Sequence, residues 1–216
     1  MLTDDQLAAL EAAWAPARAA GVLGRATVHT LWEHTAGFAS AVCSHFGRES
    51  ADLSGRLIDV GTGAGVPGLL LAQQLPGCHI TLVDANERRL DHVRRARRAL
   101  GLEDRTTVMH ARAEDLATDL RYRTGFDGAV SRLLAEPSDS AELLAPLVRD
   151  GGVIVVSTAQ RWQSIWDQLP VPELPLGAAT HHGAEDRFVQ IPRLGPVSDD
   201  LPRREKARRR QPYLRG

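Results

Sequence analysis

Cysteine and aromatic residues are scarce in this chain. Of its 216 residues only two are cysteines, and 5% are aromatic. Cys43 and Cys78 have no spacing typical of a metal or redox site, which fits a reducing compartment. The adjacent histidines His181 and His182 have no cysteine or carboxylate at ligand spacing, and neighbours on a strand point to opposite faces. We therefore expect no metal site, and few aromatic platforms on which nucleic-acid bases can stack.

A long hydrophobic run is also missing. No segment approaches the ~20 apolar residues needed to cross a bilayer, and residues 1–6 are acidic and polar, unlike a secretion signal. The content of 43% hydrophobic and 25% charged residues is ordinary for a globular protein. These features predict a cytoplasmic protein without a membrane partner, long enough for one α/β domain with a short appendage.

Positive charge is concentrated near the C-terminus. Residues 203–216 carry seven basic side chains and one acidic side chain, a net of +6, which leaves −7 for residues 1–202. Arginine makes bidentate contacts with phosphate, so this basic segment predicts a polyanionic partner. The alternative is a solvated, disordered terminus. The candidate phosphate contacts are Arg203, Arg204, Lys206, Arg208, Arg209 and Arg210.

Strand-like and helix-like segments alternate along most of the chain. A capping box at 3–6 opens a first helix, and a second helix is expected at 27–46. Strands are then expected at 56–60, 79–83, 106–110, 126–130 and 152–157, and helices at 67–75, 86–100, 114–121, 137–149 and 160–168. Two further strand-like runs, 176–182 and 186–192, are expected to form a hairpin. The alternation predicts an α/β, Rossmann-like fold with a mostly parallel seven-stranded sheet that ends in this antiparallel hairpin.

This pattern divides the chain into three predicted parts. Residues 1–54 form a helical extension, residues 55–195 the α/β core and residues 196–216 the basic tail. In a doubly wound sheet, ligands bind beyond the carboxyl ends of the strands. The residues that follow each predicted strand are therefore the candidates for a functional site.

A glycine-rich turn directly follows the first predicted strand of the core. Gly61, Gly63 and Gly65 lie between that strand and a helix, where glycine permits positive φ and a close approach of the backbone to a ligand. Asp59 precedes them, and Asp84 ends the next strand at the distance where such folds hold a ribose. This combination predicts a nucleoside-cofactor site rather than a turn that only joins a strand to a helix.

Two cofactor fingerprints overlap in this turn. Residues 63–68 satisfy the G-x-G-x-x-G of dinucleotide binders. The wider pattern Asp59-x-Gly61-x-Gly63-x-Gly65 instead resembles motif I of class I methyltransferases, which use S-adenosylmethionine (SAM) and share the layout of five parallel strands and a hairpin. SAM carries an ammonium and a sulfonium but no phosphate, so a carboxylate beside it is favourable, whereas the same carboxylate repels a pyrophosphate. Asp59 therefore favours SAM.

The next strand ends supply further candidates for the cofactor. We expect Asp84 to accept hydrogen bonds from the ribose hydroxyls, although an acid before a helix can also be its cap. After the third strand, Glu114 or Asp115 can accept from the exocyclic amine of adenine, or either can cap the helix that follows. The backbone of Ala113 and Glu114 can contact the edge of the ring in both cases.

Ser131 and Arg132 follow at the end of the fourth strand, which places both at the mouth of the expected site. Ser131 is a further candidate for cofactor contact. Arg132 can orient a purine or a phosphate with its planar guanidinium, or form a structural ion pair with Glu136 or Asp59. The chain has no Ser-His-Asp or Cys-His arrangement, and it lacks the Asn/Asp-Pro-Pro-aromatic motif of amino-group methyltransferases.

Residues 58–68 closely resemble motif I of the bacterial small-subunit rRNA guanine-N7 methyltransferases, the glucose-inhibited division protein B family. Residues 66–68, Val-Pro-Gly, are the distinguishing part, because most SAM enzymes lack this Pro-Gly. The other matching segments are 82–85, 112–115, 126–132 and 186–189, within a resemblance that covers residues 55–192. The resemblance implies SAM-dependent methylation of guanine N7 in 16S-type rRNA, free or in the 30S subunit. Within the resembling segments, Arg132 and Arg187 are the residues expected to place the substrate, while the basic tail is expected from its charge to attract RNA phosphates.

The chain departs from the family at three places. Residues 34–38 replace a His-x-x-Asp-Ser element, Ser157-Thr158 stands where Lys-Gly is usual, and residues 201–206 replace a Tyr-Pro-Arg-x-Pro-Gly tail. These elements belong to the expected RNA-facing side rather than to the cofactor side. Two other functions therefore stay open, a small-molecule methyltransferase on the same core and a nucleotide-binding module without catalysis. Because guanine N7 has an exposed lone pair and no proton, the family's reaction needs placement rather than a strong general base.

Overall fold

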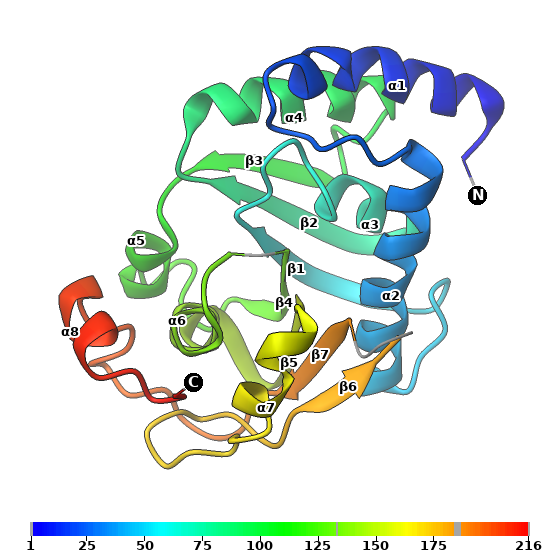
Figure 1. The fold of residues 1–216 in the computed structure, drawn as a ribbon. Helices are drawn as coiled ribbons and strands as arrows, with labels where there is room; N and C mark the ends of the chain where they lie inside the picture. The colour runs from blue at the N-terminus through cyan, green and yellow to red at the C-terminus, as the bar shows by residue number, and fades with distance from the viewer. Residues whose placement is uncertain (1, 133, 184–186, 216) are drawn as a thin grey trace.

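The computed structural model of the chain describes residues 2–132, 134–183 and 187–215 and contains one seven-stranded sheet with helices on both faces (Figure 1). The strands are β1 (Ser54–Val60), β2 (Gly77–Asp84), β3 (Thr106–His110), β4 (Phe126–Arg132), β5 (Val148–Ser157), β6 (Thr180–His182) and β7 (Phe188–Pro192). Their order is β3-β2-β1-β4-β5-β7-β6; β1 to β5 are parallel, and β7 is antiparallel to β5 and β6. The predicted α/β fold, with a mostly parallel sheet and a terminal antiparallel hairpin, is confirmed.

Helices pack against the two faces of this sheet as separate groups. The helices are α1 (Asp4–Ala19), α2 (Val28–Phe46), α3 (Gly68–Gln74), α4 (Glu87–Ala99), α5 (Ala113–Thr118), α6 (Pro137–Leu144), α7 (Gln163–Trp166) and α8 (Glu205–Arg210), with 3-10 turns η1 (Ala145–Leu147) and η2 (Gln160–Trp162). Helices α1 to α4 cover one face, and α5 to α7 cover the other (Figure 1). The helices of the predicted N-terminal extension thus contribute to the same core as the strands.

The two faces have separate cores because neighbouring side chains of a strand point in opposite directions. In β5, Val153 and Val155 belong to the core beneath α1 to α4, whereas Ile154 and Val156 belong to the core beneath α5 to α7. A strand buried on both faces reads as a continuous hydrophobic run in the sequence. This is why the central strands were recognisable from the sequence.

The observed elements differ from the predicted ones where the backbone pairing is interrupted. The predicted helix 137–149 ends at Leu144 and continues as η1, because Pro146 has no amide proton and its ring clashes with the preceding turn. The predicted strand 176–182 is reduced to β6, since Leu176 makes only an isolated bridge. Most of the predicted hairpin turn lies outside the described residues.

The carboxyl ends of β1 to β4 meet at one edge of the sheet. The amides of Gly61 and Thr62 both donate to the Val83 carbonyl at 2.9 Å, which ties the turn after β1 to the end of β2. Asp84, the last residue of β2, lies opposite His110 in β3. The sheet therefore brings together the segments that the sequence selected as a site.

Helix α1 supports the glycine turn from one face of the sheet. The fully buried Trp14 donates from Nε1 to the Ala64 carbonyl at 2.9 Å. We expect Trp14→Phe to lower the free energy of unfolding by about 1–3 kcal/mol, because it leaves this buried carbonyl unpaired. Urea denaturation measures the change, with Leu7→Ala on the exposed side of α1 as a control expected within about 0.5 kcal/mol of wild type. Full stability of Trp14→Phe contradicts the supporting role.

Candidate functional site

The turn between β1 and α3 contains three glycines in conformations that other residues rarely adopt. Gly61, Gly63 and Gly65 have φ angles of 77°, 59° and 95°, which a Cβ disfavours. Gly61 borders a hollow at the sheet edge, a space formed between the ends of β1 and β2, the start of α5, and α8. A Cβ added at Gly61 would lie 3.1 Å from Leu134. At Gly65 an added Cβ would collide with Leu69. Gly61 therefore allows close approach from the hollow, while Gly63 and Gly65 shape the turn.

Asp59 lies fully buried beneath this turn. Its Oδ2 accepts hydrogen bonds from Thr62 Oγ1 at 2.6 Å and from the Gly68 amide at 2.9 Å, while Oδ1 has no partner among the described residues. Burial raises the pKa of Asp59 to about 6, although both hydrogen bonds and the nearby Arg132 oppose the change. A buried carboxylate with an unused oxygen favours positive charge close by. Asp59 does not border the hollow, so it influences that space only through the turn that it holds and through its charge.

Asp84 is fixed at the border of the hollow. Its Oδ2 accepts from the Gly63 amide at 3.0 Å, its Oδ1 accepts from the Asn86 amide at 2.9 Å, and Arg89 Nη1 lies 3.7 Å from Oδ2. The cap of α4 is Asn86, whose side chain accepts from the Arg88 amide. Each carboxylate oxygen has two acceptor sites. Asp84 is therefore held in place and can still accept from the hydroxyls of a ligand.

The hollow itself has a volume of about 360 Å³, within the ~300–1,000 Å³ of small-molecule sites. It lies where the ends of β1 and β2 meet the start of α5, and α8 adds a further wall. The residues that matter for its chemistry are Gly61, Asp84, Ala113, Glu114, Glu205 and Arg208. Four of the nine predicted cofactor residues, Gly61, Asp84, Ala113 and Glu114, thus border one space.

The two acids at the start of α5 have different surroundings. Glu114 is half-buried and borders the hollow, and its Oε1 accepts from Arg208 Nη2 at 2.9 Å. Burial alone raises the pKa of Glu114, but the backbone hydrogen bond at the helix start and Arg208 together hold it below its ordinary value. Asp115 is exposed and does not border the hollow. Of the two predicted adenine acceptors, the geometry favours Glu114.

Ser131 lies away from the mouth of the hollow. It is fully buried, and its Oγ donates to the Val60 carbonyl at 2.8 Å, which joins β4 to β1. The prediction that Ser131 stands at the mouth is wrong, because its side chain turns into the contact between the two strands. Arg132 is half-buried, and burial lowers its pKa against the opposing charge of Asp59. Of the two acids considered as ion-pair partners, Asp59 is therefore the one whose charge opposes the lowering of the Arg132 pKa, and Glu136 is not.

A cluster of rings near Arg132 joins α2 to β7. The ring centroid of His34 lies 5.6 Å from that of Phe38 and 4.9 Å from that of Phe188. Burial lowers the pKa of His34 to about 4, with smaller effects from Arg132 and from Arg187, which is exposed just before β7. His34 is thus neutral at pH 7. It was not among the site residues predicted from the sequence, where its signals were its place in the segment 34–38 that departs from the family and its spacing of four residues from Phe38 on one face of a helix.

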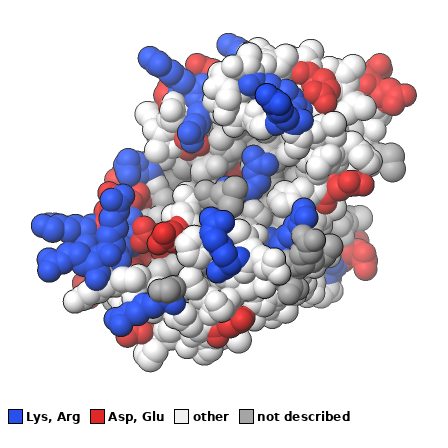
Figure 2. All heavy atoms as spheres, in the orientation of Figure 1, with Lys and Arg blue, Asp and Glu red and all other residues white. Residues whose placement is uncertain are grey.

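The C-terminal segment, residues 203–215, is folded onto the protein rather than extended as a tail. Arg203 pairs with the fully buried Glu142 at 2.7 Å, and the side chain of Arg208 is only 3% exposed. The predicted phosphate contacts are therefore wrong for Arg203 and Arg208, whose guanidinium groups are used inside the protein. The other four predicted contacts, Arg204, Lys206, Arg209 and Arg210, are exposed. Figure 2 shows basic side chains gathered at the left edge, where Figure 1 places α8.

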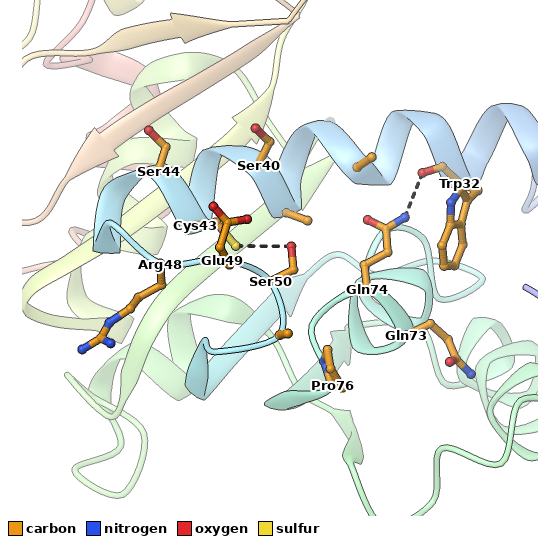
Figure 3. A pocket seen from close by; sticks show the side chains of 13 residues that line it. Trp32, Ser40, Cys43, Ser44, Arg48, Glu49, Ser50, Gln73, Gln74 and Pro76 are labelled. Carbon is orange, nitrogen blue, oxygen red and sulfur yellow. Dashed lines mark hydrogen bonds between the residues drawn. The ribbon is translucent and has the colours of Figure 1, made fainter. Parts of the chain in front are cut away.

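A larger cavity, of about 740 Å³, lies between α2 and α3 (Figure 3). Ser50 and Pro76 border it just before β1 and β2 begin, so it lies toward the amino ends of these strands. Gln74 at its wall donates to the Trp32 carbonyl at 3.0 Å. None of the described residues that border it belongs to the glycine turn. The predicted residues Gly61, Asp84, Ala113 and Glu114 border the smaller hollow instead.

Both cysteines are buried and free. In the described ranges, the structure contains no group of three or more histidine, cysteine, aspartate or glutamate side chains placed to hold a metal ion. No helix within those ranges combines the length and apolar character that crossing a membrane requires.

The strand order, with the hollow at the carboxyl ends of the parallel strands, defines a class I methyltransferase-like α/β fold. A solved structure from Corynebacterium glutamicum matches with a TM-score of 0.58 at 15% identity, covering 91% of this chain and 93% of that one. A candidate SAM-dependent methyltransferase from Methanococcus maripaludis matches with a TM-score of 0.58 at 14% identity, covering 91% and 96%. At these identities the likeness establishes the fold.

Sequence comparison identifies the family. The model of the family described as rRNA small subunit methyltransferase G matches residues 16–170. A Rubrobacter xylanophilus protein named ribosomal RNA small subunit methyltransferase G is 34% identical over 191 residues, 87% of this chain and 68% of the relative. A Synechococcus protein of the same name is 42% identical over 115 residues, 53% of this chain and 45% of the relative. The chain belongs to the rRNA small subunit methyltransferase G family, as the motifs predicted, and these matches span about half to two thirds of the relatives' length.

The buried carboxyl of Asp59 predicts a pH-dependent stability. Its pKa rises on folding from 3.8 to about 6, so this group favours the folded state at low pH, and that contribution is lost as pH rises from about 4 to above 6. The shift corresponds to roughly 3 kcal/mol. Asp59→Asn cannot titrate, so the stability of the variant relative to wild type should improve by up to that amount over this window. Urea denaturation at several pH values measures the difference; a difference independent of pH contradicts the buried charge.

Proposed function

We propose that this chain is a SAM-dependent methyltransferase that transfers a methyl group to N7 of a guanine in small-subunit rRNA. The observation that carries the proposal is the glycine turn flanked by two buried carboxylates, Asp59 and Asp84, beside one hollow of a parallel sheet. Membership of the rRNA small subunit methyltransferase G family supports the RNA substrate. Such a substrate, as free rRNA or as the 30S subunit, places the reaction in the cytoplasm.

The residues around the hollow suit SAM, which when bound supplies a methyl group activated by its sulfonium. Asp84 retains acceptor sites for the two ribose hydroxyls. Gly61 presents backbone without a Cβ, and the start of α5, at Ala113 and Glu114, provides the edge against which a purine lies. The unpaired Oδ1 of Asp59 favours a cationic ligand and disfavours a pyrophosphate.

We infer that Arg132 and Arg187 place the target guanine beside the rings at which α2 meets β7. The neutral His34 offers a hydrogen-bonding group there without adding positive charge beside a cationic methyl donor. Because guanine N7 carries no proton to remove, these side chains need only hold the base in line and exclude water. A pKa near 4 for His34 and near 6 for Asp59 leaves both in one protonation state above pH 7.

Methylation of ribosomal particles tests the proposal directly. With labelled SAM and 30S subunits that lack endogenous modification, we expect label in 16S rRNA at a guanine that borohydride and aniline then cleave. Asp84→Ala should raise the KM for SAM at least about tenfold, because it removes the charged acceptor at the ribose. Asp91→Ala, an exposed acid on α4, is the matched control with an unchanged KM. In a parallel reaction with a whole-cell extract, label confined to small metabolites supports the small-molecule alternative, and SAM binding without any product supports a non-catalytic module; both outcomes contradict the proposal.

The exposed basic side chains of the C-terminal segment are proposed to contact RNA phosphates. Replacing all four with glutamine should flatten the dependence of RNA affinity on salt, because fewer counterions are released on binding. On single-stranded RNA the slope should fall by about 0.7 for each phosphate that the variant no longer neutralises. The four are Arg204, Lys206, Arg209 and Arg210. Filter binding at several salt concentrations measures the slope.

Charge-matched replacement of exposed arginines elsewhere is the control for this experiment. The control variant changes four exposed arginines to glutamine, Arg25 before α2 and Arg88, Arg95 and Arg98 of α4. A smaller slope in the C-terminal variant alone assigns the contact to that segment, whereas equal slopes in both variants contradict it. Deleting the whole segment is unsuitable, because it leaves the fully buried Glu142 without Arg203.

A further inference from the structure

Arg208 connects the C-terminal segment to the hollow. Its Nη2 donates to Glu114 Oε1 at 2.9 Å, its Nε lies 3.3 Å from Asp139 Oδ1, and its Nη1 donates to the Arg203 carbonyl at 2.6 Å. One almost fully buried guanidinium thus joins the start of α5, helix α6 and the segment that precedes α8. Both Arg208 and Glu114 border the hollow.

The segment around α8 is also anchored independently of Arg208. Arg203 donates to both carboxylate oxygens of Glu142, at 2.9 and 2.7 Å, and its guanidinium carbon lies 3.6 Å from the centre of the Tyr213 ring. Ser138 Oγ accepts from the amides of Tyr213 and Leu214 at 2.9 and 3.2 Å. Because these contacts hold the segment on both sides of α8, a change at Arg208 tests its own role more than the docking of the segment.

The position of Glu114 depends on these arginines. A glutamate side chain near a surface ordinarily exchanges among several rotamers, and fixing one opposes its conformational entropy. Arg208 holds Oε1, and Arg112 Nε lies 3.7 Å from Oε2. The carboxylate is therefore oriented along the wall of the hollow, and its lone pairs exceed the donors that these two contacts supply.

We propose that Arg208 is a positioning residue of the cofactor site, holding Glu114 so that its carboxylate accepts a hydrogen bond from the exocyclic amine of the adenine. This inference rests on the proposed SAM-dependent function. It makes the inner side of α8 part of the cofactor site, while the outer side carries the basic residues proposed for RNA. The arginine-rich segment then determines selectivity for an adenine base, and not only electrostatic attraction.

Calorimetric titration of the full chain separates positioning from a structural role. The two ligands are S-adenosylhomocysteine and its inosine analogue, whose base presents a keto oxygen, an acceptor, where adenine presents the exocyclic amine as a donor. We expect Arg208→Gln and Glu114→Ala each to weaken S-adenosylhomocysteine binding about tenfold, with binding of the analogue within about twofold of wild type. The double variant should be no weaker than Glu114→Ala alone, because Arg208 acts through Glu114. Arg208→Lys should restore only part of the affinity, since lysine lacks the fork that spans several acceptors.

A surface ion pair of the same kind provides the control. Arg121→Gln breaks an exposed pair with Asp119 just beyond α5 and should leave both affinities unchanged. An equal loss for both ligands in Arg208→Gln, or no loss for either, overturns the positioning role. If Arg208→Gln fails to fold, Glu114→Ala still decides the test, because Glu114 is only half-buried. An unchanged preference of Glu114→Ala for S-adenosylhomocysteine over the inosine analogue overturns the inference. Wild type that binds neither ligand refutes the proposed function itself, before any variants are compared.

Discussion

The hydrogen bonds that Asp59 accepts from Thr62 and from the Gly68 amide organise the whole candidate site. They close the turn at its base and fix where α3 begins. The backbone of the turn, bonded to the Val83 carbonyl, then sets the end of β2, and the Gly63 amide holds Asp84. A buried carboxylate is unfavourable unless it is paired, so the fold keeps Asp59 only because the turn provides donors. The same hydrogen bonds therefore set the backbone conformation of the turn and the positions of the two buried carboxylates.

At this edge of the protein some charged side chains are buried and others are exposed, and the two groups differ in their surroundings. The buried carboxylates lie under and beside the glycine turn, where they suit a cationic ligand. The C-terminal segment divides its arginines in the same way: Arg203 and Arg208 neutralise acids inside the protein, and its other basic side chains face solvent. A segment that appears uniformly basic in the sequence thus serves two physical roles. Its inner residues pair with acids at and beside the hollow, and its outer residues keep their charge exposed to solvent.

Prediction from the sequence was most accurate where the signal is local. Positive φ at Gly61, Gly63 and Gly65 and the position of Asp84 follow from a short stretch of chain whose chemistry permits few alternatives. The prediction was wrong for Ser131, because a residue at the end of a strand can turn into the strand contact or toward the ligand, and the pattern of residue types does not distinguish the two. His34 was not selected for a related reason. Its partner Phe188 reaches it only after the sheet has formed.

Hydrophobic periodicity and glycine conformations act over a few neighbouring residues, so the alternating α/β order, the strand that leads into the glycine turn and the acids beside it were readable from the sequence. Which of the charged side chains are available to a ligand depends instead on the packing of distant segments. Arg203 meets Glu142 across 61 positions of the chain, and Arg208 meets Glu114 across 94. Pairs so distant leave no periodic trace in the sequence. Their burial depends on how α8 packs against α5 and α6, so the roles of these arginines were settled by packing rather than by composition.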